Sequence, residues 1–121
     1  MSDKPHAKFI VWQKGMDFAV ELYRLTKSFP PQEKYGIAAQ LQKTAVSIPA
    51  NISEGAARKT TKELLHFLSI SAGSLSELDT ELEICRRVKL IDEKVYFELT
   101  QNLEEISKLL LGLAKSLRKK L

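Results

Sequence analysis

The residues best able to do chemistry in this sequence are two histidines and one cysteine. His66 follows Glu63 in a Glu-x-x-His arrangement, which is half of the ligand set of a di-iron helical bundle. The arrangement occurs once, and neither a Cys nor a second His stands at ligand spacing, so no metal site is predicted. Cys85 continues an apolar stripe and is expected in the core, while His6 lies near the start of the chain. We therefore expect no catalytic residue, no cofactor and no small-molecule substrate, and we expect that the protein is not an enzyme.

Basic side chains offer a different chemistry, the attraction of phosphate. The chain holds 19 basic and 15 acidic residues, a net charge of +4. The last seven residues hold four bases and no acid: Lys115, Arg118, Lys119 and Lys120. The remaining charges cancel, so the excess belongs to the tail, where cations also complement a helix dipole. A second basic group, expected to form a local patch around one loop, comprises Lys43, Arg58, Lys59 and Lys62.

Two further sets of polar or small residues recur at helical spacing. One follows steps of four and three residues and comprises Gln40, Thr44, Ser47, Asn51 and Glu54. This polar seam is a solvated face, an internal hydrogen-bond network or the lining of a subunit interface. The other set comprises Ser69, Gly73 and Ser76, and its small side chains let a helix of the same or another subunit approach closely.

An acidic run follows these small residues and consists of Glu77, Asp79, Glu81 and Glu83. With the bases after it, the run suits a solvated surface or complementary poles for head-to-tail assembly, and Glu83 with Arg87 forms an (i, i+4) pair.

Four periodic segments must position these side chains, at about residues 10–28, 31–54, 60–88 and 92–117. Pro31 suits the first turn of the second helix, and Gly55 suits a left-handed terminator. Thr60 and Asp92 are predicted N-caps of the last two helices. The fourth segment repeats leucine and isoleucine at heptad spacing, and the connections are short. The predicted fold is therefore all-α, an antiparallel up-down-up-down four-helix bundle.

The bulk properties agree with one domain over residues 1–121, with a flexible start over about 1–9 and a basic tail over about 115–121. A single cysteine excludes an intramolecular disulfide and favours a reducing compartment. No uncharged run approaches the roughly 20 residues that span a bilayer. We expect a cytoplasmic protein without membrane contact.

A family resemblance rests on the run QLQKTAVSIPANISEG at residues 40–55, followed by Arg58. Similar motifs flank it: YRLT at 23–26, FP at 29–30 and ExYG at 33–36 before it, and FL at 67–68, AGSL at 72–75 and EL at 77–78 after it. Over about residues 12–91 the chain resembles the 23S rRNA intervening-sequence proteins. The resemblance implies a four-helix bundle that assembles as a ring-like homopentamer. It also implies a relation to the accessory variability determinant of diversity-generating retroelements, which binds nucleic acid and a reverse transcriptase through a strongly basic surface.

These observations together predict a non-enzymatic, oligomeric bundle that binds RNA or an RNA-handling partner. The predicted contacts are Lys43, Arg58, Lys59 and Lys62, with Arg118, Lys119 and Lys120 as a flexible tail. Such binding is electrostatic and weakly selective for sequence. The alternative is a purely structural or protein-binding module that does not bind nucleic acid.

Overall fold

The computed structural model describes residues 4–121, which form four long helices and two short 3-10 helices. In chain order these are η1 (Pro5–Lys8), α1 (Ile10–Thr26), η2 (Pro31–Glu33), α2 (Ile37–Ala56), α3 (Thr61–Arg87) and α4 (Glu93–Arg118). No strand occurs within this part of the chain. The predicted all-α fold of four helices is confirmed.

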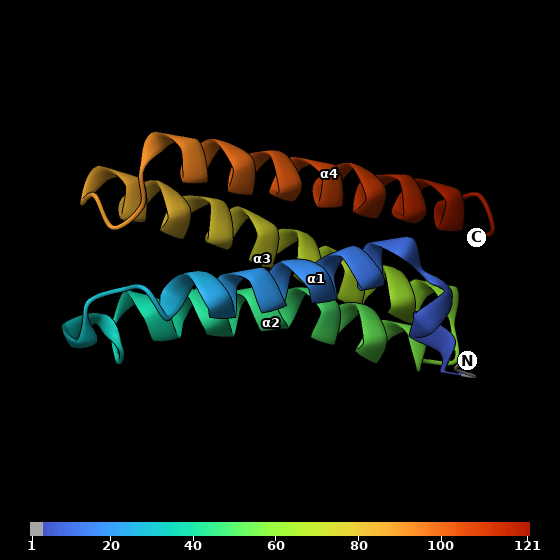
Figure 1. Ribbon diagram of the computed structural model, residues 1–121. Coiled ribbons are helices and arrows are strands. Elements are labelled where there is room, and N and C mark those ends of the chain that lie inside the picture. Colours follow the sequence, from blue (N-terminus) through green and yellow to red (C-terminus); the bar gives the residue numbers. More distant parts are fainter. Residues whose placement is uncertain (1–3) are drawn as a thin grey trace.

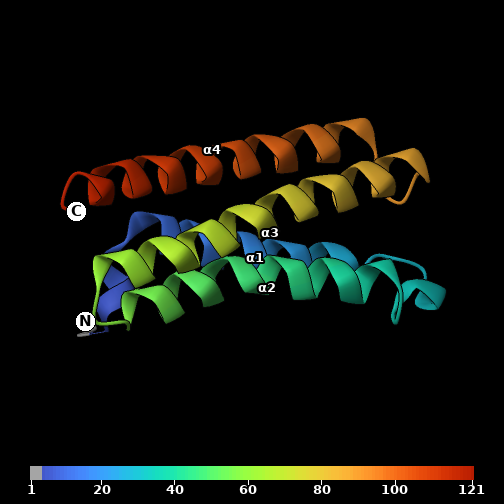
Figure 2. The same cartoon turned by 180° about the vertical axis from the view of Figure 1, so that it is seen from behind.

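Successive helices run in opposite directions along a common axis (Figures 1 and 2). The α1–α2 and α3–α4 connections lie at one end of the bundle. The α2–α3 turn lies at the other end, together with the start of α1 and the end of α4 (Figure 1); we call this the turn end. The closest pair of helices is α2 with α3, and the least extensive contact is between α1 and α4. Among the described residues, no helix is long and apolar enough to cross a membrane.

The second helix begins later than predicted. Pro31 starts the single turn of η2, and α2 begins only at Ile37. Gly36 precedes it with φ −108° and ψ −118°, a conformation outside the helical region that separates η2 from α2. Pro31 therefore stands in the first turn of a helix as predicted, but this helix is the short η2 and not α2.

The predicted role of Gly55 as a left-handed terminator is wrong. None of the described glycines has a positive φ, and α2 continues through Gly55 to Ala56. The absence of a side chain serves packing instead, because a Cβ atom at Gly55 would lie 2.7 Å from the Cβ of Phe67 and 3.2 Å from the carbonyl oxygen of Leu64. Glycine therefore lets α2 and α3 meet closely just before their shared turn.

The ends of the last two helices follow capping rules. The Thr60 hydroxyl accepts a hydrogen bond from the Glu63 amide at 3.1 Å, and the Asp92 carboxylate accepts one from the Val95 amide at 2.8 Å. Both predicted N-caps are confirmed. Helix α3 ends without the glycine that often follows a helix. Lys89 adopts the left-handed conformation instead, with φ 65°, and the Leu90 amide donates a hydrogen bond to the carbonyl of Cys85 at 2.9 Å.

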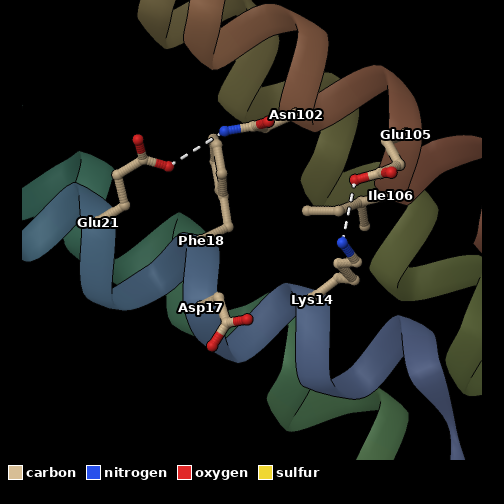
Figure 3. Close-up of a pocket in the computed structure, with 7 residues that line it drawn as sticks. All are labelled: Lys14, Asp17, Phe18, Glu21, Asn102, Glu105 and Ile106. Atoms are coloured by element: carbon tan, nitrogen blue, oxygen red, sulfur yellow. Dashed lines mark hydrogen bonds and ion pairs between the residues drawn. The ribbon is translucent and has the colours of Figure 1, made fainter.

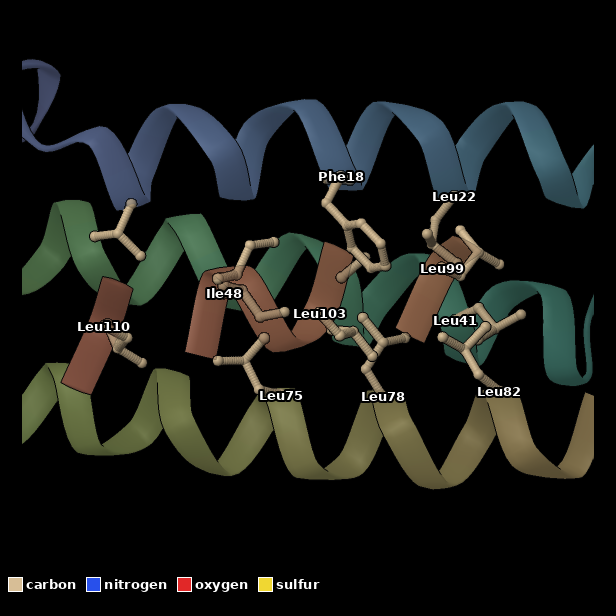
Figure 4. Close-up of a cluster of buried hydrophobic side chains, with 14 of the residues drawn as sticks. Phe18, Leu22, Leu41, Ile48, Leu75, Leu78, Leu82, Leu99, Leu103 and Leu110 are labelled. Atoms are coloured by element: carbon tan, nitrogen blue, oxygen red, sulfur yellow. The ribbon is translucent and has the colours of Figure 1, made fainter. Parts of the chain in front are cut away.

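The core is a column of mostly aliphatic side chains contributed by all four long helices (Figure 4). Its members include Phe18, Leu22, Leu41, Ile48, Leu75, Leu78, Leu82, Leu99, Leu103 and Leu110. The heptad leucines of α4 are buried as the spacing predicted, apart from the half-buried Leu113. Cys85 is fully buried among these side chains.

The two chain ends are more regular than expected. The predicted flexible start falls partly on residues 1–3, which lie outside the described residues; from Pro5 to Lys8 the chain forms η1, which contacts α1 and α2. The predicted basic tail begins within α4, which remains helical through Arg118. Lys115 and Arg118 therefore lie on the helix, and Lys119 and Lys120 follow its end.

Candidate nucleic-acid interface

Three of the predicted contact residues lie around the α2–α3 turn. Arg58 forms an ion pair with Glu54 at 2.9 Å, and its guanidinium lies over the ring of Phe67 at 4.9 Å from the centroid. These two contacts hold the side chain against the helix ends and partly offset its charge. Lys59 and Lys62 are exposed and form no ion pair in the described structure, so their ammonium groups face water.

The end of α4 brings further cations to the same end of the bundle (Figures 1 and 2). Arg118 is the last helical residue, and Lys119 and Lys120 follow it directly, all three exposed. Because the C-terminal end of the helix dipole favours positive charge, these cations are favourable at this position even without a bound ligand. The structure therefore brings to one end two basic groups that are separated by nearly half of the sequence.

Lys43 does not belong to this group. It is exposed on the outer face of α2, about four helical turns before the α2–α3 turn, which places it roughly 20 Å away along the axis. The predicted patch around the loop therefore loses this member. Lys43 is close to the polar seam in the sequence, which is why it was grouped with the loop. Because α2 is a continuous helix, the residues between Lys43 and the loop place them far apart along the helix axis.

Sequence reasoning missed one cation at the turn end. Lys8 belongs to η1, which folds back beside α1 and α2 at the turn end. It is exposed, and its ammonium group lies 5.5 Å from the centroid of the Phe9 ring. No periodic signal precedes residue 10, so only the fold could place it.

The polar seam lies along the contact between α2 and α3. The hydroxyls of Ser47 and Ser74 share a hydrogen bond of 2.7 Å, and Thr44 donates to a carboxylate oxygen of Glu81 at 3.0 Å. Ser71 adds a further bond by donating to the carbonyl of Ile48 at 2.9 Å. The centre of the seam is thus an internal hydrogen-bond network that ties the two helices together.

The ends of the seam behave differently from its centre. Gln40 is exposed and donates to Glu77 at 3.2 Å, whereas Glu54 is exposed and holds Arg58. Asn51 donates to the carbonyl of Ser47 on its own helix at 2.8 Å. The seam is therefore solvated at both ends and internal only in between.

One residue of the acidic run departs from the expected solvated surface. Glu81 is only 6% exposed and faces α2, while Glu77 and Asp79 are exposed and Glu83 is partly exposed. Burial is the largest cause that raises the pKa of Glu81. Its partner, Thr44, belongs to the polar seam. The sequence shows the seam and the acidic run as separate patterns, so it does not predict that these two residues pair.

The small-residue set lies on the outside of α3. Ser69, Gly73 and Ser76 are all exposed, and a Cβ atom at Gly73 would meet nothing within 4 Å. Ser76 lines a hollow between α3 and α4, whereas Gly73 has open space before it, so close packing among the described helices does not explain why Gly73 is small.

An apolar groove runs between α1 and α2 on the outer face. Its exposed side chains are Met16, Val20, Tyr23 and Val46, each 40–45% exposed, and Arg24 and Lys27 line its rim. A cluster of half-exposed apolar side chains on a helical pair is typical of a surface that contacts another molecule.

A small hollow of about 150 Å³ separates α1 from α4 (Figure 3). Lys14 pairs with Glu105 at 3.5 Å on one side of it, and Asn102 donates to Glu21 at 3.3 Å on the other. Ligand pockets usually enclose about 300 Å³ or more. This hollow therefore links two helices and is too small to hold an organic substrate.

The described residues contain no group of three or more His, Cys, Asp or Glu side chains arranged to hold a metal ion. His66 is exposed and contacts the edge of the Phe67 ring. Burial raises the pKa of the Cys85 thiol to about 11, so the thiolate that nucleophilic chemistry needs is scarce near neutral pH.

The chain is similar to known proteins over most of its length. The model of the 23S rRNA-intervening sequence protein family matches residues 7–112. A solved structure from Bacteroides thetaiotaomicron, described as a protein of unknown function from the S23 ribosomal protein family, aligns with a TM-score of 0.82 and 27% identity. The alignment covers 88% of this chain and 96% of that one. No curated protein matches. With its four-helix fold and a family match that extends from η1 into α4, the chain belongs to the 23S rRNA-intervening sequence protein family.

Proposed function

We propose that this protein is a non-enzymatic, cytoplasmic bundle that binds the phosphate backbone of structured RNA through its turn end. The observation that carries the proposal is the convergence there of Lys59 and Lys62 with Arg118, Lys119 and Lys120. These five side chains are exposed and form no ion pair in the described structure. Cations clustered on one face supply the salt-sensitive affinity that phosphates recognise.

The chemistry of this end also limits its selectivity. Lysine ammonium groups on a turn and a helix end contact phosphates, whereas sequence is read by side chains that reach base edges. Arg58 is held by Glu54 and Phe67, so we assign it a positioning role at the turn. Lys43 faces a different surface and lies outside the proposed site. Binding is therefore expected to follow the shape and charge of the RNA.

A titration of structured RNA at two salt concentrations tests this proposal. Removing the charges with Lys59→Gln and Lys62→Gln should weaken binding at low salt and lower the salt slope by about one unit per lost phosphate contact. The matched control is Lys34→Gln with Lys94→Gln, which removes the same charge from the opposite end and leaves the apolar groove unchanged. Binding that ignores salt, or that falls equally in both double variants, would reject the proposal.

A second candidate function, protein binding and self-assembly, is favoured by the apolar groove. We propose that the groove is covered in a homo-oligomer, for which the family resemblance implies a ring of five. The exposed small residues on α3 give a neighbouring helix room to approach. Repetition of the turn end in each subunit would multiply a modest affinity for RNA through avidity.

Light scattering after size exclusion separates the two candidates. The wild-type chain should elute as a multiple of its 13.7 kDa mass, and Val20→Glu with Val46→Glu should reduce it to the monomer. Ile84→Glu with Phe97→Glu, which places the same two charges at exposed apolar sites outside the groove, is the control. A wild-type monomer would reject assembly while leaving RNA binding by the single subunit open to the titration.

The proposal does not extend to the reverse-transcriptase partner of the related accessory variability determinant. That role uses a strongly basic surface, whereas here the charges outside the last seven residues cancel.

A further inference from the structure

Glu81 is the one carboxylate of the described chain that is buried within a contact between helices. Its side chain projects from α3 toward α2, where its Oε2 atom lies 3.0 Å from the hydroxyl oxygen of Thr44. Its Oε1 atom is buried and has no hydrogen-bond partner, and no cation of the described residues forms an ion pair with it. An ionised carboxylate in this position would leave half of its charge uncompensated, which is costly inside a protein.

The Thr44 hydroxyl has more nearby acceptors than it has hydrogens to donate. The Thr44 hydroxyl lies 2.9 Å from the carbonyl oxygen of Gln40 and 3.0 Å from Glu81, yet it carries a single hydrogen. If Glu81 is ionised, that hydrogen can serve only one of the two acceptors. If Glu81 is protonated on Oε2, the carboxyl donates to Thr44 while Thr44 donates to Gln40, and both contacts become hydrogen bonds.

The charged surroundings act in the same direction. On its own helix, Glu77 stands one turn before Glu81 and raises the pKa of its carboxyl, and the thiol of Cys85 stands one turn after. Glu33 of η2 adds negative charge near Cys85. Polar contacts with Gln40 and Thr44 of α2 act the other way, although the amide of Gln40 donates its hydrogen bond to Glu77; desolvation is the largest cause and the net pKa of Glu81 is raised.

We propose that Glu81 and Thr44 form a proton-dependent latch between α2 and α3, closed while the Glu81 carboxyl is protonated. The folded state holds this proton to a higher pH than the unfolded chain does. The stability that the latch contributes is therefore complete below the ordinary pKa of 4.5 and declines as the pH rises through the interval up to the folded-state pKa. The latch makes the α2–α3 contact sensitive to proton concentration.

The test compares denaturant unfolding of the full chain and of Glu81→Gln between pH 4 and 8, at one protein concentration. Glutamine keeps the size and remains neutral, so the unfolding constant of the wild type should rise relative to that of the variant by up to about tenfold per pH unit between the two pKa values. At neutral pH the variant should unfold at higher denaturant. Glu77→Gln, an exposed neighbour, should retain the wild-type pH dependence with only a small displacement. Parallel pH profiles for wild type and Glu81→Gln would overturn the latch.

A spectroscopic readout covers the case in which Glu81→Gln does not fold. In the wild-type protein, carbon NMR of the glutamate carboxyl groups should show one resonance that titrates above the ordinary range while the fold is intact. If every glutamate carboxyl titrates at or below the ordinary value, Glu81 is ionised in the native state and the latch does not exist.

Discussion

Replacement of Gly55 by alanine tests the tightest contact between α2 and α3. Alanine is the better helix former by about 1 kcal/mol, so propensity alone predicts stabilisation at this helical position. Geometry predicts the reverse, because the added Cβ would lie 2.7 Å from the Cβ of Phe67 and 3.0 Å from Cδ1 of Leu64. A Cβ atom is attached to the backbone and cannot swing aside, so the helices must separate.

The expected magnitude follows from these opposing effects. Overpacking costs about 1–3 kcal/mol, and a contact with atoms next to the backbone belongs near the upper value. After the propensity gain, Gly55→Ala should lower the free energy of unfolding by about 2 kcal/mol, measured by urea denaturation.

Gly112→Ala, in the exposed face of α4, is the matched control for this experiment. A Cβ atom at Gly112 meets nothing within 4 Å, so the same substitution should gain up to about 1 kcal/mol there. The two variants should therefore differ by about 3 kcal/mol in opposite directions. Equal stabilisation by both would show that α2 and α3 are not held together at Gly55, and the reasoning about this contact would be refuted.

Substitutions at three further positions test the corner between α3 and α4. Lys89→Gly should raise the free energy of unfolding by about 1 kcal/mol, because φ 65° strains a residue with a Cβ; Lys89→Ala should give no such gain in the same thermal melt. Asp92→Ala should lose about 1 kcal/mol in urea denaturation by removing the cap, whereas Asp92→Asn should retain most of it. Hydrogen bonds from Arg86 and two further donors lower the pKa of Glu83 to about 2, so the stability it contributes is present above 4.5 and lost as the pH falls toward 2. Acid unfolding should be less steep in that interval for Glu83→Gln, and an unchanged profile would exclude this account.

Periodicity predicted the elements of this fold because each helix carries its own apolar stripe and its own start signal. Thr60 and Asp92 act through bonds to residues three positions away, so local sequence was enough to identify them. Gly55 was misread because glycine has two uses, a positive φ and close approach. Only the position of Phe67 on the neighbouring helix decides between them.

The candidate site was predictable in composition and not in arrangement. The basic residues of the tail and of the α2–α3 turn can both be identified in the sequence. Their placement at one end of the bundle depends on the number and direction of the helices between them. Lys43 shows the opposite error, since nearness in sequence became separation along a helix axis. Glu81 had no local signal at all: its burial depends on how α3 is rotated toward Thr44.

The strength of the contacts between helices differs around the bundle, and this bears on how the turn end would meet RNA. Helices α2 and α3 are joined by the close approach at Gly55 and by hydrogen bonds along their buried seam. Helix α4 meets α1 over the least extensive contact, where Lys14–Glu105 joins exposed side chains and contributes little. Lys59 and Lys62 therefore project from the pair of helices with the most extensive contact, while Arg118 projects from a helix with less contact to its neighbours. In the proposed complex with RNA, we expect a phosphate chain that spans both groups to meet one more firmly and one less firmly supported anchor, which suits recognition of RNA shape without a fixed sequence.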